Sequence, residues 1–364
     1  MINRILIVNL FGIGDVLFST PMPKILKRAM PASRIDFMCN ERCQPILQNN
    51  RNIDDIIVYE KDQWRAMFRT SKANFFKELY RLVRRIRGKR YDLVIDLSLG
   101  YQIAFVFMIM GIKKRIGFDY RSRGRFLTDK LPIEGFNEKH AILYYLDILK
   151  LIGIEDPGEA RPTFTLSPED EIWAESFIEQ KGLENKIFVG IAPGGGKSWG
   201  EYARYRRWDI ANFAYVAKKL AKENRDIFFL LLGSEEECSL CEPMSGPLGH
   251  VSLNLCGKLS LSQSTSLINR CSLFICNDGG LLHTAVSQGV STVSIFGPVN
   301  DKIYGPYPPS KRHKVVKGKN IECRPCYKNF KHKKCDLYEC LNSIDRDEVL
   351  RVARESLLAQ TINK

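Results

Sequence analysis

The chain has 364 residues, of which 45% are hydrophobic, and a formal net charge of +14. This length exceeds what one ordinary hydrophobic core holds, so two domains are expected. The longest strongly apolar stretch, residues 103–112, is far shorter than the roughly 20 residues that a membrane-spanning helix needs. The N-terminus is typical of a first strand and lacks the features of a signal peptide. Composition therefore predicts a cytoplasmic globular protein.

Strands and helices alternate along the first half of the chain. The apolar patterns predict strands at 5–8, 34–39, 55–58 and 93–97, and helices at 15–29, 74–87 and 140–152. Six apolar residues of the 74–87 helix fall on one face, which we expect to be buried: Phe75, Phe76, Leu79, Leu82, Val83 and Ile86. Alternation of this kind is typical of a parallel sheet with helices on both faces.

Gly, Pro and acidic residues at 153–168 indicate a linker, after which the alternation restarts. The patterns predict helices at 168–181, 210–223 and 281–289, and strands at 187–192, 227–232, 273–276 and 290–296. We therefore expect an α/β protein with two doubly wound, Rossmann-like domains facing a cleft. They would span 1–165 and 166–345, and a C-terminal helix would occupy 346–364.

A Gly-rich turn joins a strand to a helix within residues 273–298. The turn, Asn277-Asp278-Gly279-Gly280, would leave backbone N–H groups free at a positive helix end, where anions bind well. Asp278 and His283 flank this point and could contact a ribose or a pyrophosphate. The same residues also fit an ordinary strand-to-helix turn with a buried, hydrogen-bonded His283.

Two further loops of the second half carry candidate ligand-binding residues. Gly194, Gly195 and Gly196 follow a strand and would let backbone approach a ligand. Arg206 comes shortly after and could neutralise a diphosphate without metal, although a solvated basic loop has the same composition. Glu236, among three consecutive glutamates after the 227–232 strand, could accept hydrogen bonds from a ribose, or simply open a solvated helix.

Asp15 follows the first strand in the sequence Gly12-Ile13-Gly14-Asp15. A dinucleotide-binding fingerprint would need a third glycine where Leu17 stands, so that motif is not present. Asp15 would nevertheless lie at the carboxyl ends of the strands, where open α/β sheets bind ligands. It is a candidate catalytic carboxylate, and it would also suit a helix N-terminus with no catalytic role.

Positive charge is concentrated between Lys61 and Arg125, which carries 17 Lys and Arg against five acidic residues. Such a region attracts nucleic acid, anionic lipid or a phosphorylated glycolipid, or it is merely a solvated surface. Nucleic acid is not expected, because the basic helix lacks interleaved exposed aromatics and no nucleic-acid motif occurs.

Eleven cysteines in a chain predicted to be cytoplasmic favour thiols or metal ligands over disulfides. Cys323, Cys326, Cys335 and Cys340 lie within eighteen residues, a spacing that resembles a knuckle around one tetrahedral ion. We expect a structural zinc or iron there. Free thiols, or two disulfides in an exported protein, are the alternatives.

Taken together, these motifs resemble glycosyltransferase family 9, the ADP-heptose:lipopolysaccharide heptosyltransferases, over nearly the whole chain. The resemblance rests on residues 5–8, 14–17, 20–21, 114–118, 140–146, 192–194, 207–208, 277–280, His283 and 296–298. The chain departs from the family in having Arg206 where Lys is usual, and Gly279 where Ser or Thr is frequent. Some similar proteins, including protein-modifying heptosyltransferases that bind iron, also have a Cys-rich tail.

The resemblance implies a GT-B fold, an inverting mechanism and no catalytic cofactor. It implies that Asp15 is the general base and that the ADP group is held by Arg206, Asp278, the N–H groups of Gly279, Gly280 and Leu281, and His283. The first domain would bind the acceptor, with Arg121, Arg123 and Arg125 meeting its charge, and the second would bind the ADP-sugar. The acceptor would be an anionic lipopolysaccharide core at the inner-membrane surface, or, alternatively, a protein.

Overall fold

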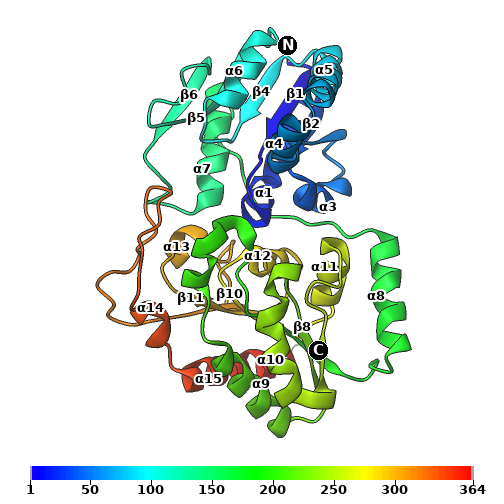
Figure 1. Cartoon of the computed structure of the whole chain (residues 1–364), viewed down its shortest axis with the longest axis vertical. Helices are drawn as coiled ribbons and strands as arrows, with labels where there is room; N and C mark the ends of the chain where they lie inside the picture. The colour runs from blue at the N-terminus through cyan, green and yellow to red at the C-terminus, as the bar shows by residue number, and fades with distance from the viewer. Residues whose placement is uncertain (1, 362–364) are drawn as a thin grey trace. The chain divides into compact units, whose positions relative to one another are not determined.

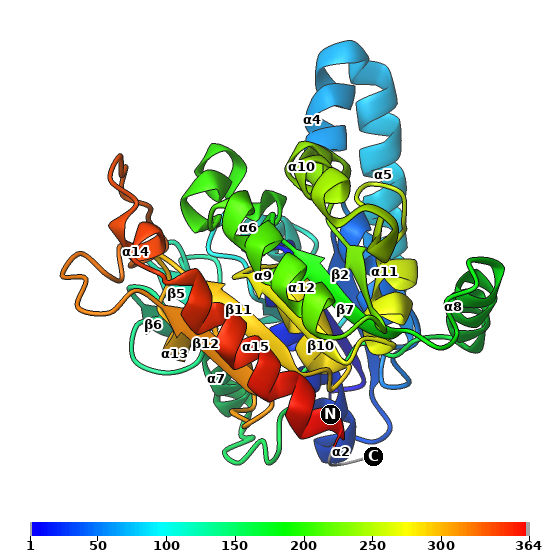
Figure 2. The ribbon, with the colours of Figure 1, turned by 90° about the horizontal axis from the view of Figure 1, so that it is seen from below.

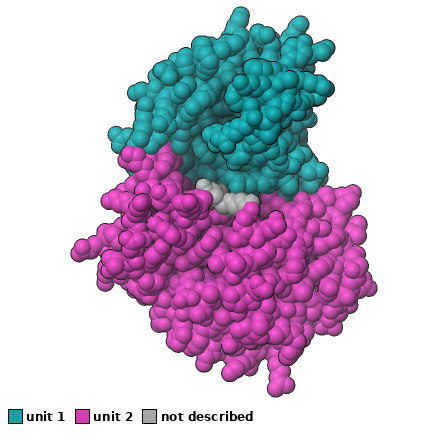
Figure 3. Space-filling model, in the orientation of Figure 1, with its two compact units in different colours: residues 1–165 teal, residues 166–364 magenta. Residues whose placement is uncertain are grey.

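The computed structural model describes residues 2–361, apart from the side chains of residues 197 and 198. It divides into two compact units, Met1–Thr165 and Leu166–Lys364 (Figures 1 and 3). Each unit has its own six-stranded parallel sheet. The expected fold class, α/β with two doubly wound units, is confirmed.

The sheet of unit 1 has the strand order β3-β2-β1-β4-β5-β6. Its strands are β1 (Arg4–Val8), β2 (Arg34–Cys39), β3 (Asp55–Val58), β4 (Leu93–Asp96), β5 (Lys114–Tyr120) and β6 (Asp129–Ile133). The order reverses between β1 and β4, which pair in parallel at the centre of the sheet. Ligands of open α/β sheets bind at such a reversal, beyond the carboxyl ends of the strands.

The described helices of unit 1 connect these strands: α1 (Ile13–Ser19), α2 (Pro21–Ala29), α3 (Gln44–Gln48), α4 (Lys61–Thr70), α5 (Lys72–Lys89), α6 (Gln102–Ile109) and α7 (Ala141–Asp147). The prediction of one helix over 15–29 is wrong, because the helix is interrupted at Thr20, between α1 and α2. Pro21 and Pro23 have no N–H to continue the hydrogen bonds of α1, and they begin a second helix instead.

Helices α4 and α5 lie side by side as a hairpin (Figure 2). The C-terminal part of α5 packs on the sheet through Leu82 and Ile86. Its N-terminal part packs on α4 instead, where Phe75 contacts Trp64 and Phe68. The prediction that Phe76 is buried is therefore wrong, since its side chain is 59% exposed.

The basic helix also exposes more aromatic surface than the sequence indicated. Tyr80 on α5 and Phe68 on α4 are exposed together with Phe76. Lysines and arginines separate these rings along both helices. The expectation that exposed aromatics are not interleaved with this positive charge is thus wrong.

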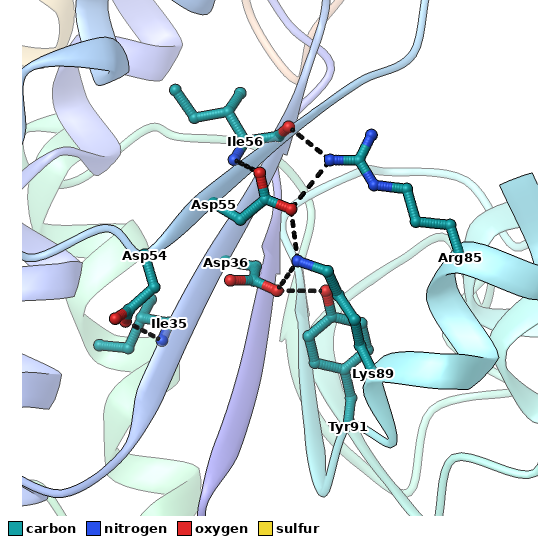
Figure 4. A network of polar contacts seen from close by, with 8 residues as sticks. All are labelled: Ile35, Asp36, Asp54, Asp55, Ile56, Arg85, Lys89 and Tyr91. Atoms are coloured by element: carbon teal, nitrogen blue, oxygen red, sulfur yellow. Dashed lines mark hydrogen bonds and ion pairs between the residues drawn. The ribbon is translucent and has the colours of Figure 1, made fainter.

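A polar network fastens the end of α5 to β2 and β3 (Figure 4). The Lys89 ammonium donates to Asp36 Oδ2 at 2.6 Å and also to Asp55. The Tyr91 hydroxyl donates to the same Asp36 oxygen at 2.6 Å, and Arg85 donates to Asp55 at 2.8 Å. Asp36 is buried, so these bonds hold the hairpin to the sheet at a point that water hardly reaches.

The sheet of unit 2 has the order β12-β11-β10-β7-β8-β9. Its strands are β7 (Ile187–Ala192), β8 (Ile227–Leu231), β9 (Ser252–Asn254), β10 (Leu273–Asn277), β11 (Thr292–Phe296) and β12 (His313–Lys317). Counted from its own first strand, this is the same order as in unit 1. Its reversal lies between β7 and β10, which pair in parallel.

Helices cover both faces of this sheet: α8 (Pro168–Gln180), α9 (Ile210–Glu223), α10 (Cys238–Leu248), α11 (Leu261–Asn269), α12 (Gly280–Ser287), α13 (Asp301–Tyr304), α14 (Glu339–Asn342) and α15 (Arg346–Thr361). Alternate strand residues enter two separate cores, as Val189 and Ile191 do on one face and Phe188 and Ala192 on the other. Helix α15 adds Val349 to the first core, so the C-terminal helix is part of unit 2. Positions 362–364 of that predicted helix lie outside the described residues.

No helix in the described part of the chain is both long and apolar enough to cross a bilayer.

The Asp36 network predicts an asymmetry between buried and exposed carboxylates. Asp36→Ala would leave the Tyr91 hydroxyl without its acceptor and Lys89 with one carboxylate fewer, at a cost of about 2 kcal/mol. Asp62→Ala is the matched control, because Asp62 is 85% exposed and its ion pair with Arg65 spans 3.5 Å. Its cost should stay within about 0.5 kcal/mol.

The free energy of unfolding of unit 1 is measured in urea for both variants, with hydrogen exchange in peptides from β2 and β3 as the probe. Equal unfolding midpoints for the two variants would contradict the role given to the network.

Candidate functional site

Two Gly-rich loops meet at the strand reversal of unit 2. Gly194, Gly195 and Gly196 follow β7, and Asp278 and Gly279 follow the neighbouring strand β10. A Cβ atom at Gly279 would lie 2.9 Å from the Gly195 carbonyl oxygen, closer than real Cβ contacts allow. Glycine at 279 therefore lets the two loops touch. This close approach leaves no room for the Ser or Thr side chain that is frequent at this position in the family.

A buried ion pair lies at this junction. The Arg206 Nη1 atom is 3.3 Å from Asp278 Oδ2, and the two side chains are 8% and 6% exposed. Arg206 Nη2 donates to the Gly195 carbonyl at 2.6 Å. Burial raises the pKa of Asp278, and the neighbouring guanidinium opposes that shift. The Arg206 Nε atom is buried without a hydrogen-bond partner among the described residues, so this cation retains donor capacity.

Asn277 ties three segments together behind the pair. Its side-chain amide donates to the Pro193 carbonyl at 2.6 Å and accepts from the Trp208 backbone N–H at 3.1 Å. Arg207 adds a bond from its Nε to the Gly194 carbonyl at 3.0 Å. These bonds hold the loop after β7 and the segment that carries Arg206 against the end of β10. Asn277 was not predicted to have this role, although an amide at a strand end is a usual turn signal.

Helix α12 begins immediately after the ion pair, with Gly279 as the residue before its first turn. Its first N–H groups are those of Gly280 and Leu281, which an α-helix leaves without an intrahelical partner, whereas the Leu282 N–H donates to the Gly279 carbonyl at 3.2 Å. His283 lies in this first turn and is buried, as is Asp278. The structure thus brings the predicted Asp278 and Gly279 against Arg206 and Gly195, which were also predicted, and it places the predicted Gly280, Leu281 and His283 at the start of the adjoining helix.

The acidic residue that supports this site is Glu237. Glu236, chosen from the sequence, is exposed. Glu237 is buried, and its Oε1 atom accepts from the Gly196 N–H at 2.7 Å. Its other oxygen accepts from the N–H and hydroxyl of Ser234. The Ser234-to-Glu237 spacing of a capping box was the signal that could have identified it.

In unit 1, Asp15 lies in the first turn of α1, just after the carboxyl end of β1. The Tyr145 hydroxyl donates to Asp15 Oδ1 at 3.0 Å, and Tyr145 is itself buried. The Asn9 side-chain amide donates to the Asp15 carbonyl at 3.0 Å, which fixes the turn before the helix. Both the backbone and the carboxylate of Asp15 are therefore oriented.

A second carboxylate lies at the same edge of the sheet. Asp96 ends β4, which is the neighbour of β1, and burial raises its pKa to about 7. The Ser98 N–H donates to Asp96 Oδ1 at 2.9 Å. Asp96 was not predicted, because a single aspartate at the end of an apolar run carries no motif.

Arg121, Arg123 and Arg125 are exposed on the loop between β5 and β6. Arg121 and Arg123 lie over the Tyr120 ring, and Arg125 lies 4.6 Å from the centre of the Tyr101 ring. The loop follows the carboxyl end of β5, at the edge of the parallel sheet where Asp15 and Asp96 lie.

The four clustered cysteines differ in burial, from exposed Cys323 to buried Cys340. Burial raises the pKa of Cys340 to about 11, and the other three thiols add to the rise. They are therefore near enough to sense one another's charge. Within residues 2–361, however, no three His, Cys, Asp or Glu side chains are grouped so that they could hold a metal ion.

Most of the chain is similar to proteins of one known family. Residues 79–336 match the family model of glycosyltransferase family 9 (heptosyltransferase). Lipooligosaccharide heptosyltransferase 2 of Haemophilus ducreyi is 25% identical over 325 residues, which cover 86% of this chain and 88% of that protein.

Two solved structures share the fold. The glycosyl transferase family 9 structure from Veillonella parvula is 25% identical, with a TM-score of 0.81 over 98% of both chains. The ADP-heptose LPS heptosyltransferase II of Escherichia coli is 22% identical, with a TM-score of 0.76 over 98% of this chain and 99% of that one. With its fold and its family match in agreement, the chain belongs to glycosyltransferase family 9, the heptosyltransferase family, and is a glycosyltransferase.

Proposed function

We propose that this protein transfers heptose from ADP-heptose to a sugar of the lipopolysaccharide inner core. The printed names of its relatives support this donor and this acceptor class. The observation that carries the proposal is the buried Arg206–Asp278 pair between two touching glycine loops. It places a buried guanidinium with an unused Nε donor at the point where α/β sheets bind nucleotides.

The donor's diphosphate binds at this point. Arg206 donates to the phosphate oxygens, and the N–H groups of Gly279, Gly280 and Leu281 meet them from the start of α12. His283 and the Gly195 backbone complete the phosphate contacts. An arginine offers two donors in one plane where a lysine offers a point charge, so the pair of charges on ADP is held without a catalytic metal.

The ribose lies beside the loop after β8. Glu236 accepts hydrogen bonds from its hydroxyls, since Glu236 is exposed and stands next to the residue that anchors the glycine loop. Glu237 already accepts from the Gly196 N–H with one oxygen and from Ser234 with the other.

Asp15 acts as the general base of an inverting transfer. The acceptor hydroxyl oxygen forms a bond to the anomeric carbon while the bond from that carbon to the ADP oxygen breaks. Asp15 takes the hydroxyl proton, and ADP leaves with the bonding electrons. The Tyr145 hydrogen bond keeps the carboxylate turned in one direction.

Asp15→Asn should retain ADP binding and lose roughly 100-fold or more in turnover, because an amide cannot accept the proton. Turnover is measured with ADP-heptose and a heptose-deficient lipopolysaccharide core. Isothermal titration with ADP is the control, since the substitution lies outside the proposed diphosphate contacts. Turnover within a few-fold of the wild-type rate would remove Asp15 from this role.

The acceptor meets unit 1, at a peripheral position on the cytoplasmic face of the inner membrane. Support comes from the charge and apolar residues of the same region. The 61–125 segment has a net charge of +12, and nine of the twelve exposed large apolar side chains of the described residues fall within or beside it. On α6 these include Phe105, Val106 and Ile109. Apolar side chains beside basic ones suit an anionic membrane surface.

Arg121, Arg123 and Arg125 contact the phosphates or carboxylates of the core. Replacing all three with Ser should raise the apparent acceptor constant roughly tenfold at low salt and flatten its salt dependence, because exposed charges are screened by ions. Steady-state kinetics at several salt concentrations measure both effects.

A matched triple of exposed arginines elsewhere in unit 1, Arg34, Arg51 and Arg161, controls for net charge. Its acceptor constant should change much less. If both triples behave alike, or if the first one weakens ADP binding instead, the assignment of this loop to the acceptor is wrong.

The Cys-rich segment, residues 323–340, binds one structural zinc or iron ion. Support comes from the Cys-x2-Cys spacing and from the mutual electrostatic effect of the four thiols. A bound cation would offset the repulsion between their thiolates. The side chains would have to draw together around the ion.

Elemental analysis of protein purified without added metal should therefore find about one zinc or iron per chain. Cys326→Ser should release it, whereas Cys238→Ser, outside the segment, should not. A metal-free protein with four titratable thiols in the segment would exclude the site.

A further inference from the structure

The N-terminal end of the Cys-rich segment is hydrogen-bonded to the sheet edge of unit 2. The N–H groups of Cys326 and Tyr327 donate to the Pro298 carbonyl at 3.0 and 3.2 Å. Arg324 donates to the carbonyls of Gly297 and Val299 at 2.7 and 3.0 Å. These acceptors belong to the loop that follows β11, the neighbour of β10 in the sheet. The segment thus starts at the same edge of the sheet as the Arg206–Asp278 pair.

Aromatic contacts then join the Cys-rich segment to the element that contains Arg206. His332 and Tyr327 lie against Trp199, with ring centres 4.0 and 4.8 Å away. His332 also stacks on Tyr202 at 4.9 Å, with 10° between the ring planes. Trp199 and Tyr202 belong to the 3-10 segment Lys197–Arg206.

Trp199 in turn contacts the cation of the site. The Arg206 guanidinium carbon lies 4.2 Å from the centre of the Trp199 ring. One face of the guanidinium thus rests on an indole, while its edge reaches Asp278 and the Gly195 carbonyl. The contacts form one continuous series from His332 through Trp199 to Arg206.

His332 can pack beside a cation because it is neutral. Burial lowers the pKa of His332, and the Arg206 charge lowers it further. Its Nδ1 atom is buried and has no hydrogen-bond partner among the described residues. The ring therefore contributes packing and shape at neutral pH, as a phenyl ring would.

Packing against Trp199 lowers the entropy that the Arg206 side chain would lose when it binds a ligand. A free arginine side chain loses up to about 2 kcal/mol of rotamer entropy when one conformation is imposed. A guanidinium that is already held by a ring face and by two polar partners does not lose it again on binding. Holding the guanidinium plane in advance thus favours a ligand with two negative charges.

We propose that His332 and Tyr327 are positioning residues for the donor nucleotide, and that they hold Trp199 against Arg206. The Cys-rich segment then serves the donor site directly. This inference rests on the proposed role of Arg206 in binding the diphosphate of ADP.

The test compares three variants of the full-length protein: His332→Ala, His332→Phe and Leu337→Ala. Leu337 is the matched control, because it lies in the same segment and is 70% exposed. His332→Ala should raise the ADP dissociation constant and the donor KM by about tenfold. Acceptor KM, and kcat at saturating donor, should stay near wild type.

His332→Phe should restore ADP affinity to within about twofold of wild type, since it replaces the ring but not the nitrogens. Leu337→Ala should bind ADP as wild type does. A role in general folding predicts instead that acceptor KM and kcat change as well.

Wild-type ADP affinity in His332→Ala would overturn the inference, as would failure of His332→Phe to restore a lost affinity. If His332→Ala melts well below wild type, Tyr327→Leu replaces it, with Tyr327→Phe as its rescue and the same expected results. A wild-type protein that does not bind ADP would overturn the proposed function itself, which is a different outcome from normal binding in all variants.

Discussion

The Arg206–Asp278 pair is the interaction on which the donor site depends. Two charges buried at one point must be matched, because each alone would cost several kcal/mol to remove from water. The surrounding structure meets this demand with short contacts: Gly279 against Gly195, Asn277 across two loops and Glu237 on the Gly196 N–H. The pair leaves a cation with spare donor capacity at the strand reversal of unit 2.

The two units share one sheet order but place different charged groups at the strand reversal. In unit 1 the strand reversal is lined by carboxylates, Asp15 after β1 and Asp96 at the end of β4. In unit 2 it is lined by Arg206 and the start of a helix. Glycosyl transfer from a nucleoside diphosphate releases a proton from the acceptor and develops negative charge on the leaving group. The roles proposed for Asp15 and Arg206 would meet these two requirements.

Local patterns were sufficient for much of the fold. Buried parallel strands such as Ile187–Ala192 are continuous apolar runs, and α9 carries a regular amphipathic pattern, so both were predicted at their observed bounds. The strands β5 and β6 were not predicted, because charged and polar residues such as Lys114 and Asp129 interrupt them. Phe76 was misplaced because the helical pattern of α5 does not reveal that its first half packs on α4.

In the candidate site, too, features set by local sequence could be predicted and features set by packing could not. Glycines beside Asp278 and His283 form a local motif, so their proximity could be predicted from sequence, while their binding roles and that of Asp15 remain predictions. Composition does not separate Glu237 from Glu236, and only the capping-box spacing from Ser234 favours Glu237 as the residue that bonds Gly196. The contact of His332 with Trp199 joins residues more than a hundred positions apart and has no sequence signal.

The central claim is heptosyl transfer from ADP-heptose to the lipopolysaccharide core, and a direct transfer assay tests it. The purified protein is incubated with ADP-heptose and, in separate reactions, a heptose-deficient core and a protein acceptor, and the products are weighed by mass spectrometry. The account predicts one added heptose on the core, with release of one ADP, and none on the protein. Transfer to the protein alone, or no transfer from ADP-heptose to either acceptor, would contradict it.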